Sequence, residues 1–523
     1  MTNYLLNRLL RGVLSIILVV AIVMILVYSL VDRNYIFLQD SSYTKTISNE
    51  RVAYKYRCWE DYDYLDYVPY TDFLAERAKA GEITTEERLK LANLGYTAAD
   101  DEEDVAAAVR LFTETYEAKG YTVVRLDADM TNGNLKRGGA QQLFAHRDKP
   151  LIQRLWKYFT HLITIDNVHY AKEDIENRGI SFTLFDPVYG GKKLSPAVIG
   201  NGTKHKYLLY FDNKFPFVHQ QLFNVNLGLS YSVNTGVDVF DTMTQSQGSI
   251  VKSEITYPSG YVAEVSRDLH SATYAANTYS SGDPFYVTRF VDDYTLLEPV
   301  KGSLSKTGFS FVIGILSVAM AYLLGIPLGL AMAQHKEKLV DKLGTLYIVF
   351  IIAVPSLAYI FMFRSIGKAV GLPHTFDVDS ANRLMYILPI VSLALPSIGG
   401  LMKWTRRYMI DQMNSDYVKF ARSGGLTDRE IFSKHILKNA IIPIVHAIPG
   451  SILGALTGAI ITESVYTVPG AGGMLVKAIN FYDNGVIIGL TLFYATLSVL
   501  SLIIGDILMA LIDPRISFTS KAR

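Results

Sequence analysis

Six long apolar stretches constrain this 523-residue chain more than any other feature. Each is long enough to cross a hydrocarbon core of about 30 Å as an α-helix, the structure that pairs its own backbone groups where lipid offers no partners. Prolines within them predict kinks, namely at Pro327, Pro355, Pro389, Pro396 and Pro449. The sequence therefore predicts a mostly α-helical membrane protein with six spans, at 13–31, 307–333, 343–363, 384–402, 441–467 and 486–512.

The first apolar stretch has two interpretations, a cleaved secretory signal peptide or a retained span. It runs on into Asp32 and Arg33 without the small-residue cleavage site of a signal peptide, which favours a retained span. The short loops that would lie inside carry most of the loop lysine and arginine, including Arg8 and Arg11. The positive-inside rule then predicts both termini in the cytoplasm and residues 32–305 outside.

Residues 32–305 contain no further span and predict an extracytoplasmic insert of α+β type. The first half, through Ala145, carries capped helical patterns such as TTEERLKLANL and EEDVAAAVRLFTETYEAKG. After Pro150, β-prone runs such as ISFTLF, KYLLYF and SIVKSEITY follow. The single cysteine, Cys58, excludes an intrachain disulfide. Three regions are expected: 1–31 as cytoplasmic N-terminus and first span, 32–305 as the insert, and 306–523 as a five-helix core with a cytoplasmic loop at 403–440.

A polar and basic segment at 416–443 interrupts the apolar series and predicts a cytoplasmic helix-turn-helix. The first helix should stop at Gly424 and Gly425, because glycine accepts the left-handed backbone conformation. Thr427 and Glu430 have the spacing of a capping box that starts the second helix. In that helix the apolar face is expected at Phe432, Ile436 and Ala440, and the charged face at Glu430, Lys434 and Lys438.

The same segment resembles the cytoplasmic EAA loop of permease subunits of ABC importers. The alanine and glycine of that loop match Ala421 and Gly425, and its later residues match Ile431, His435, Asn439 and Pro443. ESVYTVPGAGG at 463–473, DILMALIDPRI at 506–516 and the N-terminal YLLNRLLRG resemble, more narrowly, the B-type permeases of oligopeptide and dipeptide importers. One departure is Phe420, which stands where the loop motif opens with glutamate.

This resemblance implies a type I permease fold and a pore-forming role in ATP-driven import of oligopeptides. It implies a second permease subunit, two cytoplasmic ATPase subunits and an extracellular peptide-binding lipoprotein as partners, in the cell membrane of a Gram-positive bacterium. Because the chain has no GxxxxGK[ST] phosphate loop, ATP and Mg are expected on the partner subunits, and this chain is not expected to be an enzyme. The residues expected to contact an ATPase are Ala421, Arg422, Ser423, Gly424, Gly425, Leu426 and Thr427.

Little else in the sequence points to chemistry, and no catalytic, cofactor-binding or metal-ligating residue is expected. A formal net charge of +1 gives no general attraction to nucleic acid, and no HExxH, CxxC or GxSxG motif occurs. Three ionisable residues in or near spans are functional candidates by default: His446, Glu463 and Asp506. The structural alternative for Asp506 is an ion pair with Arg515 or with a neighbouring helix.

Other classes of function stay open at this stage. A membrane-tethered receptor or sensor would need a cytoplasmic output domain, and the inner loops are short; a secondary transporter would show inverted repeats. Within the importer class, dipeptides or nickel chelates are alternative substrates. LWKYFTHLITID and LGLSYSVNTGVDVF resemble pieces of the family's ordinary first external loop, so we interpret the insert as an elaboration of that loop. Its place between the first two spans suits a docking platform for the binding protein or a vestibule wall that guides peptide into the pore.

Overall fold

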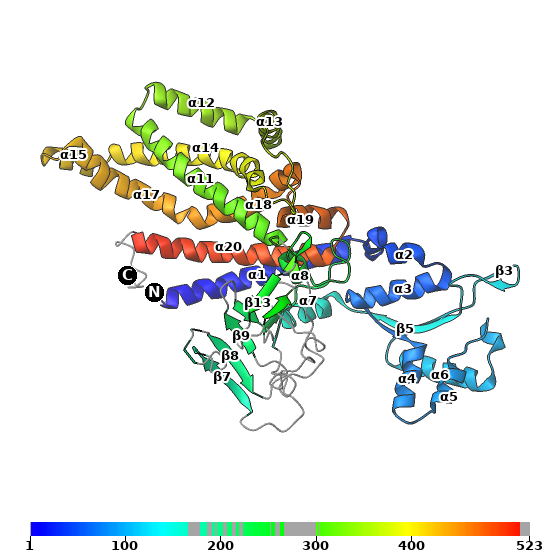
Figure 1. Ribbon diagram of the computed structural model, residues 1–523. Helices are drawn as coiled ribbons and strands as arrows, with labels where there is room; N and C mark the ends of the chain where they lie inside the picture. The colour runs from blue at the N-terminus through cyan, green and yellow to red at the C-terminus, as the bar shows by residue number, and fades with distance from the viewer. Residues whose placement is uncertain are drawn as a thin grey trace.

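A computed structural model describes residues 2–165, 178–185, 191–192, 194, 196–201, 207–211, 216–218, 223–251, 253–256, 262–265, 300–301 and 303–512. Figure 1 shows a bundle of long helices at one end and a smaller mixed domain at the other. The bundle helices are α1 (Thr2–Leu30), α11 (Lys306–Gln334), α12 (Leu339–Ala353), α13 (Ser356–Ala369), α14 (Ile387–Met413), α15 (Asp416–Ser423), α16 (Asp428–Glu430), α17 (Leu437–His446), α18 (Ile448–Tyr466), α19 (Ala471–Asn480) and α20 (Asn484–Ile512).

Within the described residues, five helical stretches are long and apolar enough to cross a membrane, and α12 with α13 makes a sixth if the pair is one bent span. The prediction of one helix over 343–363 is therefore wrong, since the two helices meet at an angle of 109°. Pro355 explains the break, because proline pushes the preceding residue out of the helical conformation. Val354 is extended, with φ −84° and ψ 127°.

The helices α11 and α14 form the central pair of the bundle. Gly325 and Gly329 lie one turn apart on α11, and a Cβ added at Gly329 would come within 2.7 Å of the Thr405 Cβ on α14. Glycines at this spacing let two membrane helices approach closely. Arg406 of α14 also donates hydrogen bonds of 2.5 and 2.7 Å to both carboxylate oxygens of Asp341, which ties α12 to the pair.

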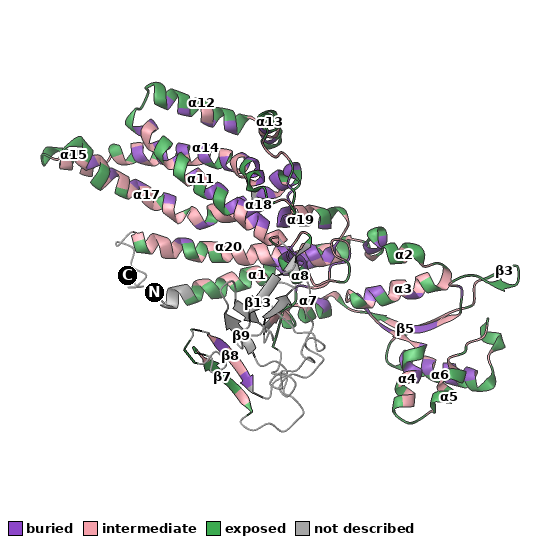
Figure 2. Ribbon diagram, in the orientation of Figure 1, coloured by how far each residue is buried: buried purple, intermediate pink, exposed green. Residues whose placement is uncertain are grey.

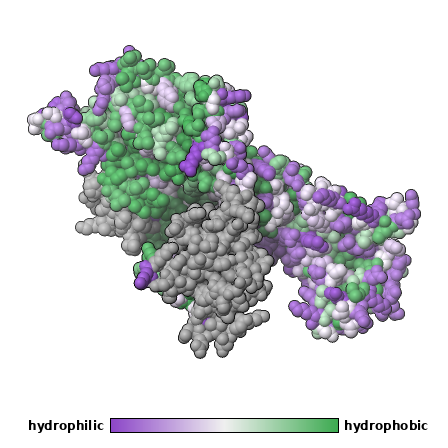
Figure 3. Space-filling model, viewed as in Figure 1, coloured by the Kyte–Doolittle hydropathy of each residue, from purple (hydrophilic) through white to green (hydrophobic). Residues whose placement is uncertain are grey.

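The surface of the bundle is apolar. Figure 3 shows hydrophobic side chains over the bundle and hydrophilic ones over α15 and the distal insert. On α1 and α12, Leu14 and Leu346 are 67% and 65% exposed, and Figure 2 shows exposed residues along both helices. Leucines exposed along whole helices fit a lipid environment. The described residues thus form a multi-pass membrane bundle, with α15 and the start of α1 at one end and the insert at the other (Figure 1).

The distal insert is a small α+β domain on a three-stranded antiparallel sheet. The strands β1 (Leu65–Pro69), β5 (Gln142–Asp148) and β2 (Thr122–Leu126) lie in the order β1-β5-β2. Its core contains Phe73, Phe112 and Tyr116, from α4 (Tyr70–Lys79) and α6 (Glu103–Ala118). The predicted helices are present as α5 (Thr85–Leu91) and α6, whereas this sheet was not predicted in the first half of the insert.

The three β-prone runs are confirmed as strands. ISFTLF overlaps β7 (Gly179–Thr183), KYLLYF contains β9 (Tyr207–Phe211), and SIVKSEITY contains β12 (Ile250–Val251) and β13 (Ser253–Thr256). The other insert elements are η1 (Arg33–Gln39), α2 (Ser41–Lys45), α3 (Ser48–Asp61), η2 (Ala98–Asp100), β3 (Met130–Thr131), β4 (Asn134–Leu135), α7 (Leu151–Thr160), β6 (Ile163–Ile165), β8 (Ala197–Asn201), β10 (Pro216–Val218), β11 (Phe223–Val225), α8 (Val239–Thr244), β14 (Val262–Val265) and β15 (Val300–Lys301).

A buried carboxylate joins the insert to the bundle. Asp483, immediately before α20, accepts hydrogen bonds through Oδ2 from the Ser230 hydroxyl at 2.8 Å and from the backbone N–H groups of Tyr231, Ser232 and Val233 at 3.1, 2.9 and 3.0 Å. The Asp483 side chain is fully buried. These donors belong to the LGLSYSVNTGVDVF stretch, so the part of the insert that resembles an ordinary external loop lies directly on the bundle.

Candidate functional site

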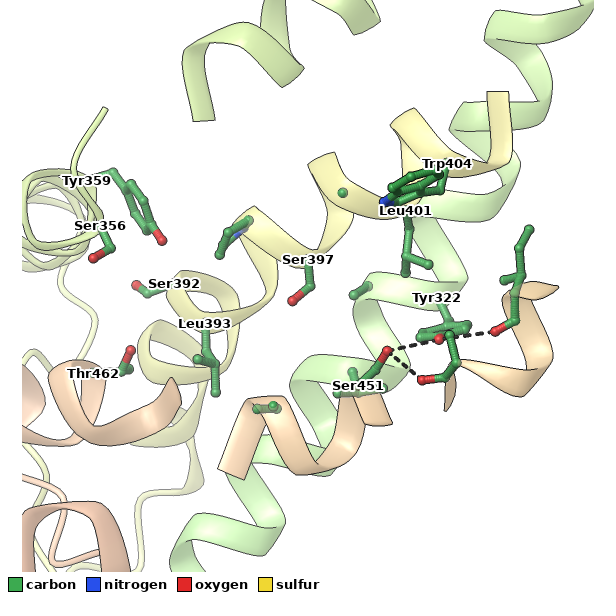
Figure 4. A pocket seen from close by; sticks show the side chains of 18 of the residues that line it. Tyr322, Ser356, Tyr359, Ser392, Leu393, Ser397, Leu401, Trp404, Ser451 and Thr462 are labelled. Carbon is green, nitrogen blue, oxygen red and sulfur yellow. Dashed lines mark hydrogen bonds between the residues drawn. The ribbon is translucent and has the colours of Figure 1, made fainter. Parts of the chain in front are cut away.

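A cavity of about 620 Å³ lies between α11, α13, α14, α17 and α18. Figure 4 shows hydroxyl groups from α11, α13, α14 and α18 around it. The hydroxyl-bearing residues that line it are Tyr322, Ser356, Tyr359, Ser392, Ser397, Tyr408, Ser451 and Thr462. Leu393, Leu401 and Trp404 add apolar wall. The cavity therefore offers a ligand both hydrogen-bonding groups and apolar contact within the membrane.

Some of these hydroxyls also hold the surrounding helices together. Tyr322 Oη lies 3.1 Å from Ser451 Oγ and donates to the Ile444 carbonyl at 3.4 Å (Figure 4). Ser392 Oγ lies 2.8 Å from the buried Tyr466 Oη. Our sequence analysis missed all of these residues. The signal that could have found them is the recurrence of hydroxyl side chains inside otherwise apolar spans.

The helix-turn-helix is present, and its turn is a Schellman motif. The Leu426 N–H donates to the Ala421 carbonyl at 3.3 Å, and the Gly425 N–H donates to the Arg422 carbonyl at 3.1 Å. Gly425 takes the left-handed conformation, with φ +84°, whereas Gly424 has φ −76°. Only Gly425 therefore needs to be glycine for its backbone conformation. The left-handed conformation expected at Gly424 and Gly425 is thus present at Gly425 alone.

The second helix begins as predicted but then changes its period. Thr427 and Glu430 form the capping box, in which the Thr427 N–H donates to Glu430 Oε2 at 3.1 Å. A π-helical segment, Ile431–Ile436, follows before α17. Because a π-turn adds a residue, Ile431 takes the buried position that was predicted for Phe432, which is half-buried. Ile436 and Ala440 are buried as predicted.

The turn presents a mixed surface to solvent. Of the residues expected to contact an ATPase, Arg422, Ser423, Gly424, Gly425 and Thr427 are exposed, and Ala421 and Leu426 are half-buried. Phe420, noted only as a departure from the loop motif, is 76% exposed. Beneath the turn, Val418 and Ile431 pack with Met409 of α14 in one buried cluster. An exposed aromatic side chain on a turn that is packed against the bundle is suited to bind another protein.

Comparison with known proteins decides the family. The sequence model of the family described as "Binding-protein-dependent transport system inner membrane component" matches residues 325–518. The oligopeptide transport system permease protein AmiC of Streptococcus pneumoniae is 34% identical over 527 residues, which cover 100% of this chain and 99% of AmiC. The chain belongs to this family of ABC-importer permeases. It is thus a membrane permease, and its alignment with AmiC includes the insert.

Other relatives are shorter. The oligopeptide transport system permease protein OppB of Haemophilus influenzae is 27% identical over 53% of this chain and 92% of OppB. The dipeptide transport system permease protein DppB of Lactococcus lactis is 30% identical over 40% of this chain and 68% of DppB. Because 92% of OppB aligns with only 53% of this permease, OppB is too short to contain the whole insert.

Glu463 of the permease holds the loop that leads into α19. Its Oε1 accepts from the Ser310 hydroxyl at 2.6 Å, and its Oε2 accepts from the Gly473 N–H at 3.0 Å, in the first turn of α19. A Cβ at Gly470 would overlap the Glu463 carboxylate, and one at Gly472 would lie 2.6 Å from Ile460 Cγ1. In the ESVYTVPGAGG stretch, Glu463 therefore caps the short helix α19, and Gly470 and Gly472 leave room for the Glu463 carboxylate to approach.

The other two ionisable candidates also contact neighbouring helices, although the buried Nδ1 of His446 has no hydrogen-bond partner among the described residues. Asp506 of α20 forms an ion pair with Arg8 of α1 at 2.6 Å, which confirms pairing with a neighbouring helix; Arg515 lies outside the described residues. His446 ends α17 and packs on Gly505 of α20, where an added Cβ would lie 3.2 Å from its Cε1. Asp506 and His446 thus hold α20 to its neighbours, and the structure does not group them with Glu463.

The cap of α19 leads to a prediction for the assembled permease. Glu463→Ala removes the acceptor for Ser310 and Gly473, and should lower stability by about 1–3 kcal/mol because a buried and a half-buried donor lose their partner. Glu463→Gln retains an acceptor oxygen and should lose less. The measurement is the unfolding temperature of the purified complex in detergent. An alanine variant that unfolds at the wild-type temperature would contradict the role given to Glu463.

Proposed function

We propose that this permease forms half of the membrane pore of an ATP-driven importer of oligopeptides. The observation that carries the proposal is the hydroxyl-lined cavity between lipid-exposed helices. A peptide crossing a bilayer needs partners for its amide groups and room for apolar side chains, and the cavity provides both. The full-length identity to AmiC, whose name specifies oligopeptides, supports this class of substrate.

The rest of the importer lies on other chains. Ser397 and Trp404 of the cavity are exposed on α14, which suits a pore wall completed by a second permease subunit. The chain has no phosphate loop, so two ATPase subunits bind ATP and Mg and perform the hydrolysis. An extracellular peptide-binding lipoprotein delivers substrate, and the insert at the end opposite α15 is the platform on which it docks (Figure 1).

The turn between α15 and α16 couples ATP hydrolysis to the pore. Phe420 inserts into a groove of an ATPase, and the exposed Gly424 and Gly425 allow close approach. Because Val418 and Ile431 pack on α14, a displacement of the turn moves a helix that also lines the cavity with Ser392 and Ser397. The turn, packed against α14, is thus a rigid connection between the ATPase and the cavity.

Uptake of a labelled peptide series by cells tests this function. Cells that lack the chain should lose uptake of oligopeptides, and restoration of the chain should recover it. Unchanged uptake in the absence of the chain, with the partner genes intact, would contradict the proposal. A series from two to eight residues, with a nickel chelate added, tests the substrate class at the same time.

Gly425 gives the sharpest test of coupling. Gly425→Val forces a β-branched residue into the left-handed conformation, which costs about 1–2 kcal/mol, and should abolish uptake while the chain stays in the membrane. Gly425→Asn is the matched control, because asparagine tolerates this conformation and should retain most uptake. Normal uptake by the valine variant would refute the assignment.

Cysteine labelling tests the orientation, with both termini and the turn in the cytoplasm. Burial raises the pKa of the Cys58 thiol to about 11, so the native cysteine should react slowly and give a low background. A membrane-impermeant maleimide should label Arg110→Cys, exposed in the insert, on intact cells, and Ser423→Cys only after the membrane is opened. The reverse pattern would overturn the topology.

A further inference from the structure

A second cavity, of about 290 Å³, lies where the insert meets the bundle. It is bounded by Tyr28 near the end of α1, by Arg154 and Tyr158 of α7, by Tyr64, and by the first residues of α20. It shares no lining residue with the cavity assigned to the peptide. Whatever occupies it therefore lies away from the proposed path of transport.

Arg154 is the unusual feature of this cavity. The residue is 7% exposed, and its guanidinium carbon lies 3.5 Å from the centre of the Tyr28 ring and 4.1 Å from that of Tyr64. These cation–π contacts stabilise the charge but do not use the N–H donors in the guanidinium plane. Among the described residues Arg154 Nη2 is buried without a hydrogen-bond partner. Such a donor calls for an acceptor, and the residues that the structure describes supply none to Nη2.

A second unsatisfied donor lines the same cavity. Tyr158 lies one turn after Arg154 on α7, and its buried hydroxyl also has no hydrogen-bond partner within the part of the chain described. The acidic residues that line the cavity do not fill this need. Asp63 is paired with Lys149 at 2.6 Å and with Lys157 at 2.8 Å. The site is thus built for an anion that accepts from a guanidinium and a phenol.

The surroundings indicate that the anion belongs to a lipid. On α7, Ile152 and Trp156 are 74% and 73% exposed, and they alternate along the helix with Arg154 and Tyr158, so the two pairs face opposite sides. Beside them, α1 belongs to a candidate span, Leu6–Leu30, that is mostly unburied. A helix with exposed tryptophan next to the end of a span lies at the membrane interface, the depth of lipid phosphates.

We infer that this cavity binds the phosphodiester of a phospholipid from the leaflet at the Leu30 end of α1. The guanidinium of Arg154 donates to the phosphate oxygens, as arginine does at phosphate sites. The Tyr158 hydroxyl donates a further hydrogen bond. Bound there, the lipid joins α1 to the insert through α7, next to the Asp483 contact, because Tyr231 and Gly485 also line the cavity.

Native mass spectrometry of the purified, delipidated importer complex tests this site. Phosphatidylglycerol should bind as one tight adduct, whereas diacylglycerol and inorganic phosphate, each at equal concentration, should not. Arg154→Gln should raise the apparent Kd for phosphatidylglycerol by about tenfold or more, the range expected when a charge-assisted pair is lost. Arg110→Gln, an exposed arginine elsewhere in the insert, is the matched control and should bind as the wild type does.

Tyr158→Phe keeps the test valid if Arg154→Gln does not fold. It removes a hydroxyl that has no hydrogen-bond partner among the described residues, so the delipidated variant should unfold at the same temperature as the wild type or higher. Its affinity for phosphatidylglycerol should nevertheless fall several-fold, by the loss of one hydrogen bond to a charged group. Wild-type affinity in Tyr158→Phe, or equal binding of diacylglycerol, inorganic phosphate or a transported peptide, would overturn the lipid site.

Discussion

Hydrocarbon offers no hydrogen-bond partner, and the rest of this structure depends on that constraint. Each polar group placed in a span must find a partner on another helix or face a cavity. The charged side chains take the first course: Asp506 pairs with Arg8, and Asp341 pairs with Arg406. Many hydroxyls take the second and line one cavity. The distribution of polar side chains therefore separates what holds the bundle together from what is available to a substrate.

The helix α14 both lines the cavity and packs under the turn, so it connects the two mechanically. Ser397 lies on α14 at the cavity, and Met409 lies further along α14 under the turn. Packed cores transmit displacement because they have few voids to absorb it. Between the turn and α17, the π-helical segment from Ile431 to Ile436 is a place where the register can change, as π-turns at functional sites often allow.

Local signals predicted more of this protein than long-range ones. Five of the six spans, the helices α5 and α6, and the capping box of Thr427 and Glu430 follow from neighbouring residues, and all of these are present. The partner of Asp506 could not be predicted, because Arg8 lies at the far end of the chain.

The errors have the same origin. Pro355 was predicted to kink one helix, but the chain breaks there into two helices. The residues that decide between a kinked and a broken helix are distant in sequence. A single extra residue in a π-turn moved the buried position from Phe432 to Ile431, which no periodic pattern shows. The exposure of Phe420 depends on how the whole turn is seated.

Site-specific photo-crosslinking to a peptide during transport tests the central claim most directly. A benzophenone amino acid in place of Ser397, on the cavity, should capture a labelled peptide in complexes turning over ATP, and the same group in place of Leu346, which is 65% exposed on α12, should capture lipid instead. Peptide adducts of equal yield at both positions, or none at Ser397 while transport proceeds, would contradict the assignment of this cavity as the path of the peptide.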